Sequence, residues 1–209
     1  MIAIIDYGMG NLRSVQKALD VAGGRTKVTS RPAVIRNCGK IVLPGVGAFG
    51  AAMKELKRLD LVQPIKDAIA AGKPFLGLCL GMQLLFEKSS EAPGVKGLGI
   101  LPGGVKKFRF KRCALKVPHM GWNNIRRALS VERRASEILK GVADGSYMYF
   151  VHSYYAVPED KGVVLTTTDY GGLFASGVAK DNIFGFQFHP EKSQEMGLRI
   201  MKNFVRVFK

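Results

Sequence analysis

The stretch that most constrains the fold is residues 74–87, Pro-Phe-Leu-Gly-Leu-Cys-Leu-Gly-Met-Gln-Leu-Leu-Phe-Glu. An apolar run leads to Cys79, a helical pattern starts at Leu80, and glycines stand two residues away on both sides, at Gly77 and Gly81. A side chain raised on a tight turn between strand and helix needs such small neighbours, because adjacent backbone passes closely. The pattern predicts a nucleophile elbow with sulfur at its tip. The alternative is a buried structural cysteine, since free cysteine often packs as a small hydrophobe.

Length and composition bound the class of protein. The 209 residues are 47% hydrophobic, which supports one substantial core, so residues 1–209 are expected to form a single domain. The first residues lack a signal-peptide pattern and no apolar run reaches membrane-spanning length, so the sequence predicts a cytoplasmic protein that does not enter a membrane. Cys38, Cys79 and Cys113 are odd in number and widely spaced, which fits neither a disulfide framework nor a metal site. No metal and no cofactor is expected.

The net charge of +16 arises from 32 basic and 16 acidic residues. A charge of this size favours an acidic partner, a polyanion or an anionic substrate. The basic residues are spread along the chain, however, with short groups only at 106–112, 126–127 and 133–134. No basic tail or recognition helix accompanies them, so a solvated basic surface is favoured over nucleic-acid binding.

Strands and helices alternate through the first half of the chain. Apolar runs and glycine or proline breaks predict strands at 2–5, 25–29, 40–43 and 74–78, and helices at 12–21, 51–71 and from residue 80. This order is typical of an α/β fold with an open, mostly parallel, doubly wound sheet and helices on both faces. Ligands of such sheets bind at the carboxyl ends of the strands.

The pattern changes beyond residue 87. A loop is predicted over 88–104, and short alternating strands are predicted at 105–110, 114–118, 147–155, 162–169, 173–179 and 183–189. Helices are predicted at 131–140 and 193–207. The sheet is therefore expected to have an antiparallel extension in the C-terminal half.

Two glycine-containing turns follow predicted strands. Residues 7–11, Tyr-Gly-Met-Gly-Asn, lack the third glycine and the acidic residue of a dinucleotide-binding fingerprint, so Asn11 is instead expected to cap the next helix. Residues 44–50, Pro-Gly-Val-Gly-Ala-Phe-Gly, leave backbone N–H groups free to face an anion. In one sheet with a nucleophile, this loop is where an oxyanion hole would be supplied.

A general base is predicted near the C-terminus, in Gln-Phe-His-Pro-Glu. Residues i and i+2 of an extended chain point the same way, so His189 and Glu191 share a face. A thiol nucleophile needs a base, and the base needs an acceptor that fixes its tautomer. Cys79, His189 and Glu191 supply these three parts. His119 and His152 have no carboxylate two residues away and are interpreted as structural histidines.

These segments resemble the class I glutamine amidotransferases. The segments around Cys79 and His189 are shared by that class. Four further segments are similar to the glutaminase subunits of imidazole glycerol phosphate synthases. They are the turn Asp-Tyr-Gly-Met-Gly-Asn, the loop Pro-Gly-Val-Gly-Ala-Phe, and the segments Pro-His-Met-Gly-Trp-Asn and Tyr-Phe-Val-His-Ser-Tyr. The resemblance covers nearly the whole chain. It implies hydrolysis of L-glutamine through a cysteine thioester, with ammonia passed to a cyclase subunit in a heterodimer of histidine biosynthesis.

The resemblance also implies roles for further residues. The oxyanion hole would receive one backbone N–H group from Leu80 and a second from either Val46 or Gly47. The glutamine substrate would be held by Gln83, Glu91, Ser153 and Tyr154, with Glu91 pairing its α-amino group. The cyclase interface would include Asn11, Trp122, Tyr149 and Lys192. A helix N-terminus at Leu80 would favour the thiolate of Cys79.

Three alternatives stay open at the level of sequence. Another class I glutaminase would share Cys79 and His189 but should lack Pro-His-Met-Gly-Trp-Asn. A stand-alone cysteine hydrolase could use the same elbow without a synthase partner. A polyanion-binding module is suggested by charge alone.

Overall fold

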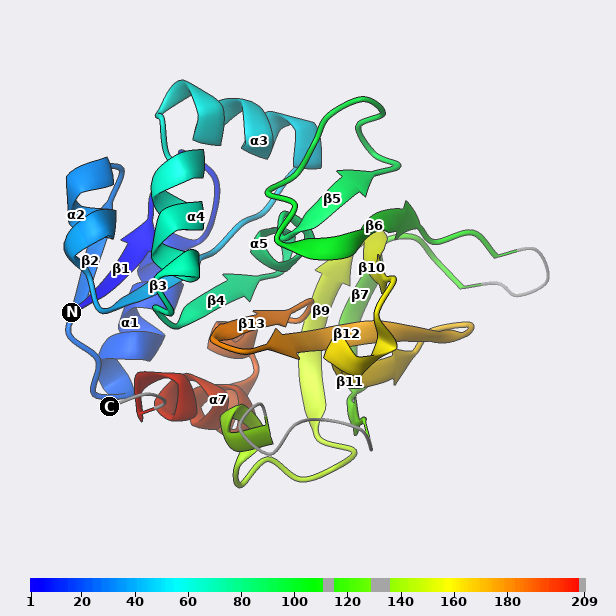
Figure 1. Cartoon of the computed structure of the whole chain (residues 1–209). Helices are drawn as coiled ribbons and strands as arrows, with labels where there is room; N and C mark the ends of the chain where they lie inside the picture. The colour runs from blue at the N-terminus through cyan, green and yellow to red at the C-terminus, as the bar shows by residue number, and fades with distance from the viewer. Residues whose placement is uncertain (111–114, 129–135, 207–209) are drawn as a thin grey trace.

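Five parallel strands form the half of the main sheet that carries the N-terminal residues (Figure 1). Their order is β2 (Thr26–Thr29), β1 (Ile2–Ile5), β3 (Lys40–Leu43), β4 (Phe75–Leu78) and β13 (Ile183–Phe186). The computed structural model describes residues 1–110, 115–128 and 136–206. Because β4 and β13 are parallel neighbours, with Leu78 opposite Phe186, the segments after both strands emerge at the same edge of the sheet.

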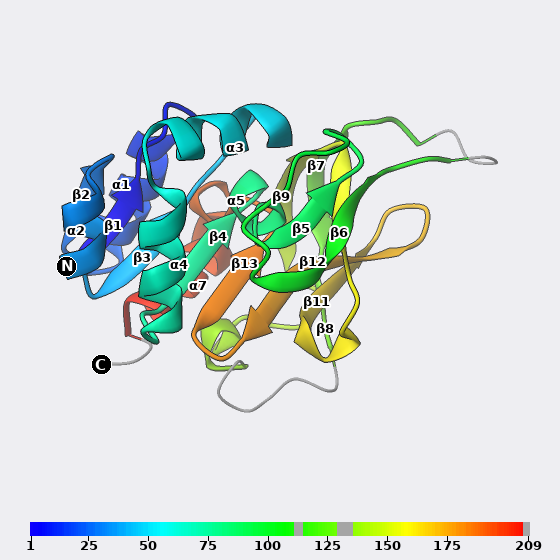
Figure 2. The same ribbon diagram turned by 45° about the horizontal axis from the view of Figure 1, so that its top comes forward.

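A mixed, mostly antiparallel set of strands extends this sheet beyond β13 (Figure 2). The order continues through β12 (Leu173–Lys180), β10 (Tyr154–Pro158), β6 (Leu101–Lys107) and β5 (Phe86–Ser89), with β11 (Val164–Asp169) pairing with β12 and with β8 (Arg126–Arg127). A second, two-stranded sheet pairs β7 (His119–Asn124) with β9 (Tyr147–His152). The predicted mostly parallel sheet with an antiparallel C-terminal extension is confirmed.

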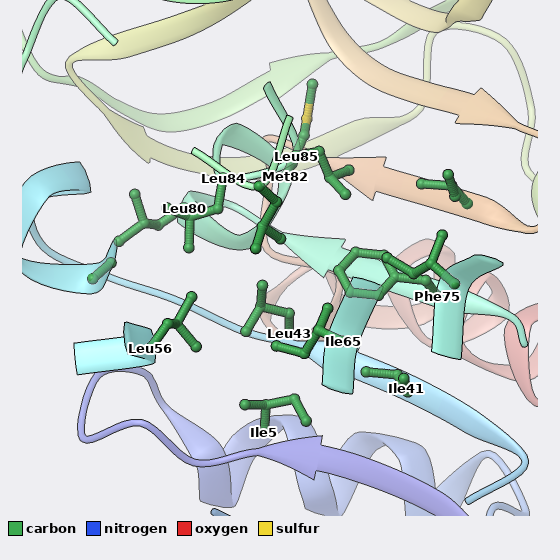
Figure 3. Close-up of a cluster of buried hydrophobic side chains, with 14 of the residues drawn as sticks. Ile5, Ile41, Leu43, Leu56, Ile65, Phe75, Leu80, Met82, Leu84 and Leu85 are labelled. Atoms are coloured by element: carbon green, nitrogen blue, oxygen red, sulfur yellow. The ribbon is translucent and has the colours of Figure 1, made fainter. Parts of the chain in front are cut away.

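Helices cover both faces of the parallel half, as predicted, because side chains of the buried strands alternate between two cores. Ile2 and Ile4 pack in one core with α1 (Leu12–Val21) and α7 (Gln194–Arg206). Ala3 and Ile5 pack in the other core with α2 (Pro32–Asn37), α3 (Phe49–Arg58) and α4 (Val62–Ala70). Figure 3 shows Leu43 between Leu56 of α3 and Ile65 of α4 in this second core, with Ile5 below them.

The helix after Cys79 is much shorter than its sequence pattern predicts. Helix α5 spans only Leu80–Gln83, and residues predicted as helix and loop instead form β5 and the start of β6. The carbonyls of Leu84 and Leu85 accept hydrogen bonds from the N–H groups of Leu98 and Ile100, at 2.8 and 2.9 Å. These long-range bonds replace the i to i+4 bonds that would continue the helix.

Other differences lie in the second half of the chain. The sequence did not predict β7, residues 115–118 lie in no strand, and residue 114 lies outside the described residues. Of the helix predicted at 131–140, residues 131–135 lie outside the described residues and Glu137–Leu139 form a 3₁₀ turn. None of the helices in the described part of the chain has the length and apolarity needed to traverse a bilayer.

Candidate active site

The turn that carries Cys79 has the sharp geometry expected of an elbow. Cys79 adopts a φ of 51°, a left-handed conformation that is strained for a residue other than glycine. A Cβ on Gly81 would come within 1.8 Å of the Leu43 carbonyl oxygen, and a Cβ on Gly77 within 2.6 Å of the Gly81 carbonyl oxygen. Both glycines are therefore required by close backbone approach.

The thiol of Cys79 is nearly buried and has two polar neighbours. Its Sγ lies 3.9 Å from the Val151 carbonyl oxygen, to which the thiol donates, and 3.6 Å from Nε2 of Gln187, which donates to the sulfur. Helix α5 begins at the next residue but has only four residues, so its dipole is that of a single turn. The helix expected to favour the thiolate is thus reduced to one turn, and Gln187 is a neighbour that the sequence did not single out.

His189 and Glu191 form a buried pair beside this elbow. Their Nδ1 and Oε1 atoms are 2.8 Å apart. Strand β13 ends at Phe186 rather than at His189, and Glu191 lies in the 3₁₀ turn η3 (Pro190–Lys192), so the turn and not strand alternation brings the two side chains together. Nε2 of His189 is buried without a hydrogen-bond partner among the described residues. This nitrogen is free to exchange a proton with a nucleophile or leaving group.

The pKa of His189 is shifted upward by this environment. Burial alone would lower the pKa, but interactions with Cys79 and with the Glu191 carboxylate raise it from 6.5 to about 10. The imidazolium form is therefore favoured in the folded protein. An imidazolium between a thiolate and a carboxylate is the protonation state from which a thiol nucleophile can attack.

This shift predicts how stability depends on pH. A folded-state pKa above the unfolded value means that the contribution of His189 is complete below about pH 6.5 and is lost as pH rises toward 10. The free energy of unfolding should therefore differ most between wild type and His189→Gln near pH 6, and the difference should shrink by pH 10. Urea unfolding of both proteins at several pH values measures this. A difference in the free energy of unfolding that stays constant from pH 6 to pH 10 would contradict the raised pKa of His189.

A pocket of about 380 Å³ opens over Cys79. The structure brings to it every residue predicted for the oxyanion hole and for substrate binding. These residues are Val46, Gly47, Leu80, Gln83, Glu91, Ser153 and Tyr154. The lining also includes Pro118, Val151 and His152, which sequence reasoning did not place there. These residues lie on β9 and on the segment before β7, and only the tertiary structure shows that both segments reach the pocket.

The oxyanion-hole donors are not all free in this structure. The N–H of Leu80 donates to the Gly45 carbonyl oxygen at 3.3 Å, whereas in the described chain the N–H groups of Val46 and Gly47 donate to no acceptor. The loop is anchored at its start by Tyr7, whose buried hydroxyl donates to the Pro44 carbonyl oxygen at 2.9 Å. Burial, and secondarily the charge of Cys79, raise the pKa of Tyr7 and keep its phenol protonated.

Two of the predicted substrate residues already have protein partners that limit what each can bind. Oε2 of Glu91 accepts a 2.8 Å hydrogen bond from the N–H of Phe49 at the start of α3, which leaves Oε1 for a cationic ligand group. Nε2 of Gln83 donates to the Tyr154 carbonyl oxygen and to Oε1 of Gln187, both at 2.9 Å. Only Oε1 of Gln83 remains for a ligand, and it can bind an N–H donor.

His119 and His152 bind one another rather than a carboxylate. Nδ1 of His119 and Nε2 of His152 are 3.0 Å apart, and the two rings lie on the paired strands β7 and β9. Burial lowers the pKa of His119 to about 4 and that of His152 to about 3. Both rings are neutral at neutral pH, which agrees with their interpretation as structural histidines.

Three of the four predicted interface residues lie together. The rings of Trp122 and Tyr149 are cross-strand neighbours with centroids 6.0 Å apart, and Nζ of Lys192 lies 5.7 Å from the Tyr149 ring. Trp122 is 47% exposed, which leaves one face open to a partner. The side chain of Asn11 caps α1 through the N–H of Ser14, as predicted.

Comparisons with known proteins agree with these motifs. A family model described as "Glutamine amidotransferase class-I" matches residues 3–208. The "Imidazole glycerol phosphate synthase subunit HisH" of Syntrophotalea carbinolica is 52% identical over 98% of both chains, and that of Aquifex aeolicus is 53% identical over 97% of this chain and 95% of its own. A solved structure described as "Crystal structure of glutamine amidotransferase" has a TM-score of 0.76 at 17% identity, covers 99% of this chain and 98% of its own, and supports the fold alone. The resemblance found in the motifs is confirmed.

Proposed function

Because the chain belongs to the class-I glutamine amidotransferase family, we propose that it is the glutaminase subunit of an imidazole glycerol phosphate synthase. In this role it hydrolyses L-glutamine to L-glutamate and ammonia for a cyclase subunit in histidine biosynthesis. The observation that carries the proposal is the placement of Cys79 and the His189–Glu191 pair at the ends of the adjacent parallel strands β4 and β13.

The proposed reaction has two halves. The thiolate of Cys79 attacks the side-chain amide carbon of glutamine, and the resulting tetrahedral intermediate expels ammonia as His189 donates a proton to the nitrogen. The product of this half is a thioester. His189, now neutral, removes a proton from water, which attacks the thioester carbon and releases glutamate and the Cys79 thiolate. Glu191 holds the imidazole ring in place through Nδ1 in both halves.

The pocket supports glutamine as the ligand. The free Oε1 of Glu91 suits an α-ammonium group, and Oε1 of Gln83 accepts from a substrate N–H. Ser153 and Tyr154 also line this pocket, whose volume is about 380 Å³. A substrate with one free amino-acid end fits this arrangement.

Partner binding is proposed to complete the oxyanion hole. One donor, the N–H of Leu80, is occupied by the Gly45 carbonyl, so the loop at 44–47 must reorient before two N–H groups can face an oxyanion. The surface formed by Trp122, Tyr149 and Lys192 adjoins the base, because the Tyr149 carbonyl oxygen accepts from the N–H of His189 at 2.9 Å. A cyclase that binds to this surface would therefore be linked to His189 by the single hydrogen bond between Tyr149 and His189.

The isolated chain is therefore expected to hydrolyse glutamine slowly and to be stimulated at least about tenfold by a cyclase subunit that carries a substrate analogue. Glutamate release with and without the cyclase measures the effect. Trp122→Ala should reduce the stimulation, whereas Leu173→Ala, which truncates another exposed apolar side chain on β12, should leave it intact. A glutaminase rate that no cyclase alters would rule out this regulation.

A further inference from the structure

We infer that Gln187 is a further catalytic residue, whose side-chain amide donates a hydrogen bond to Cys79 Sγ and stabilises the thiolate. The inference rests on the proposed role of Cys79 as the nucleophile. Gln187 is fully buried, and its Nε2 lies 3.6 Å from the sulfur. It reaches the reacting atom from a position two residues before the base, on the segment between β13 and His189.

The orientation of the Gln187 amide follows from its neighbours. The Tyr154 carbonyl oxygen can only accept a hydrogen bond, so the Gln83 atom 2.9 Å away must be the nitrogen, Nε2. Nε2 of Gln83 also lies 2.9 Å from the Gln187 side chain, and as a donor it requires the oxygen of Gln187 there. The nitrogen of Gln187 is therefore the atom directed at Cys79.

The Tyr154 carbonyl that anchors this chain is itself held by the paired histidines. It accepts from Nδ1 of His152 at 2.8 Å, so both of its lone pairs are used. With Nδ1 protonated, Nε2 of the neutral His152 accepts from His119, whose other nitrogen lies 3.3 Å from the side-chain nitrogen of Asn123. These contacts fix the tautomers of both histidines. Asn123 donates to His119, His119 donates to His152, and His152 donates to the Tyr154 carbonyl oxygen. The histidines act as positioning residues.

The chemistry of the sulfur requires such a donor. Charge on Cys79 appears when its proton is transferred to His189, and it reappears when water displaces the thiolate from the thioester. A neutral N–H donor stabilises the thiolate in both steps without competing for the proton, because an amide does not titrate. The single turn of α5 offers little dipole support, so Gln187 supplies the stabilisation that the sequence assigned to a longer helix.

The test compares wild type with Gln187→Met, which keeps an unbranched side chain of similar length and removes the donor. The full chain is treated with iodoacetamide across a pH series, and alkylation of the Cys79 peptide is followed by mass spectrometry. Losing a hydrogen bond to a charged group should raise the pH of half-maximal alkylation by about one unit or more. In the cyclase-stimulated assay, kcat should fall about tenfold or more and KM less than about twofold.

A matched control is Thr168→Val, which also removes a polar group from a fully buried side chain. Oγ1 of Thr168 has no hydrogen-bond partner among the described residues and lies outside the network, so its alkylation profile should equal that of wild type. Thermal unfolding verifies that each variant folds. If Gln187→Met does not fold, Gln187→Asn tests the same bond, because it keeps a neutral amide but withdraws its nitrogen from Cys79 by one methylene.

A wild-type alkylation midpoint in the variant would overturn the role of Gln187. Because alkylation needs no glutamine, this result is independent of whether the chain is a glutaminase. Retention of glutaminase activity in Cys79→Ala would instead overturn the proposed function, whatever the alkylation profile shows.

Discussion

Replacing Cys79 with alanine is expected to reduce glutamine hydrolysis by the cyclase-bound chain at least about a thousandfold. The thioester cannot form without the sulfur, and neither His189 nor the oxyanion loop offers a substitute nucleophile at the floor of the pocket. Glutamate release in the presence of the cyclase measures the loss. A residual rate within tenfold of wild type would contradict the assignment of Cys79 as the nucleophile.

Two controls separate chemistry from folding in this experiment. Cys38→Ala changes another buried cysteine, whose thiol donates to the Ile35 carbonyl oxygen at the C-terminal end of α2, and it should leave the rate unchanged within about twofold. Titration calorimetry should give the same affinity for the cyclase with wild type and with Cys79→Ala. Loss of that binding would show that the variant no longer forms the complex.

The second large effect is expected from Gly81→Ala. Its Cβ would meet the Leu43 carbonyl oxygen at 1.8 Å, and Leu43 cannot move away without disturbing the pairing of β3 with β4. The free energy of unfolding should fall by at least about 3 kcal/mol, beyond ordinary overpacking, and urea denaturation measures it.

Gly39→Ala is the matched control for this substitution. Gly39 is exposed and has only the Met1 carbonyl oxygen near its Cβ position, at 3.6 Å, so the change in the free energy of unfolding should stay within about 0.5 kcal/mol. Equal stabilities of the Gly81 and Gly39 variants would mean that the elbow tolerates a side chain, and the argument for its close packing would fail.

Local patterns were sufficient for the parallel half of the fold. The apolar runs at 2–5 and 40–43 predict buried strands because each strand places alternate residues in two cores, and the structure contains both strands with the same bounds. The glycines around Cys79 predict the elbow because only close backbone approach requires them at that spacing. These features depend on residues a few positions apart.

Local patterns were insufficient where distant segments compete for the same backbone groups. The apolar run after Leu80 reads as a helix, but the N–H groups of Leu98 and Ile100 bind the carbonyls that the helix would use. Likewise, β7 exists because it pairs with β9, and its own sequence has no alternating pattern. Tertiary hydrogen bonds therefore override the local preference in both places.

The same division applies to the candidate site. The sequence by itself determined which side chains meet, since Cys79, His189 and Glu191 follow from motif chemistry and from strands that end at one edge of a sheet. Only the tertiary structure decided the hydrogen bonding of the site. It showed the Gly45 carbonyl bound to the N–H of Leu80, the Nε2 of His189 without a partner in the described part of the chain, and the direction of the Gln187 amide. Hydrogen-bond direction is a property of the assembled network, because each donor is oriented by an acceptor from a distant part of the chain.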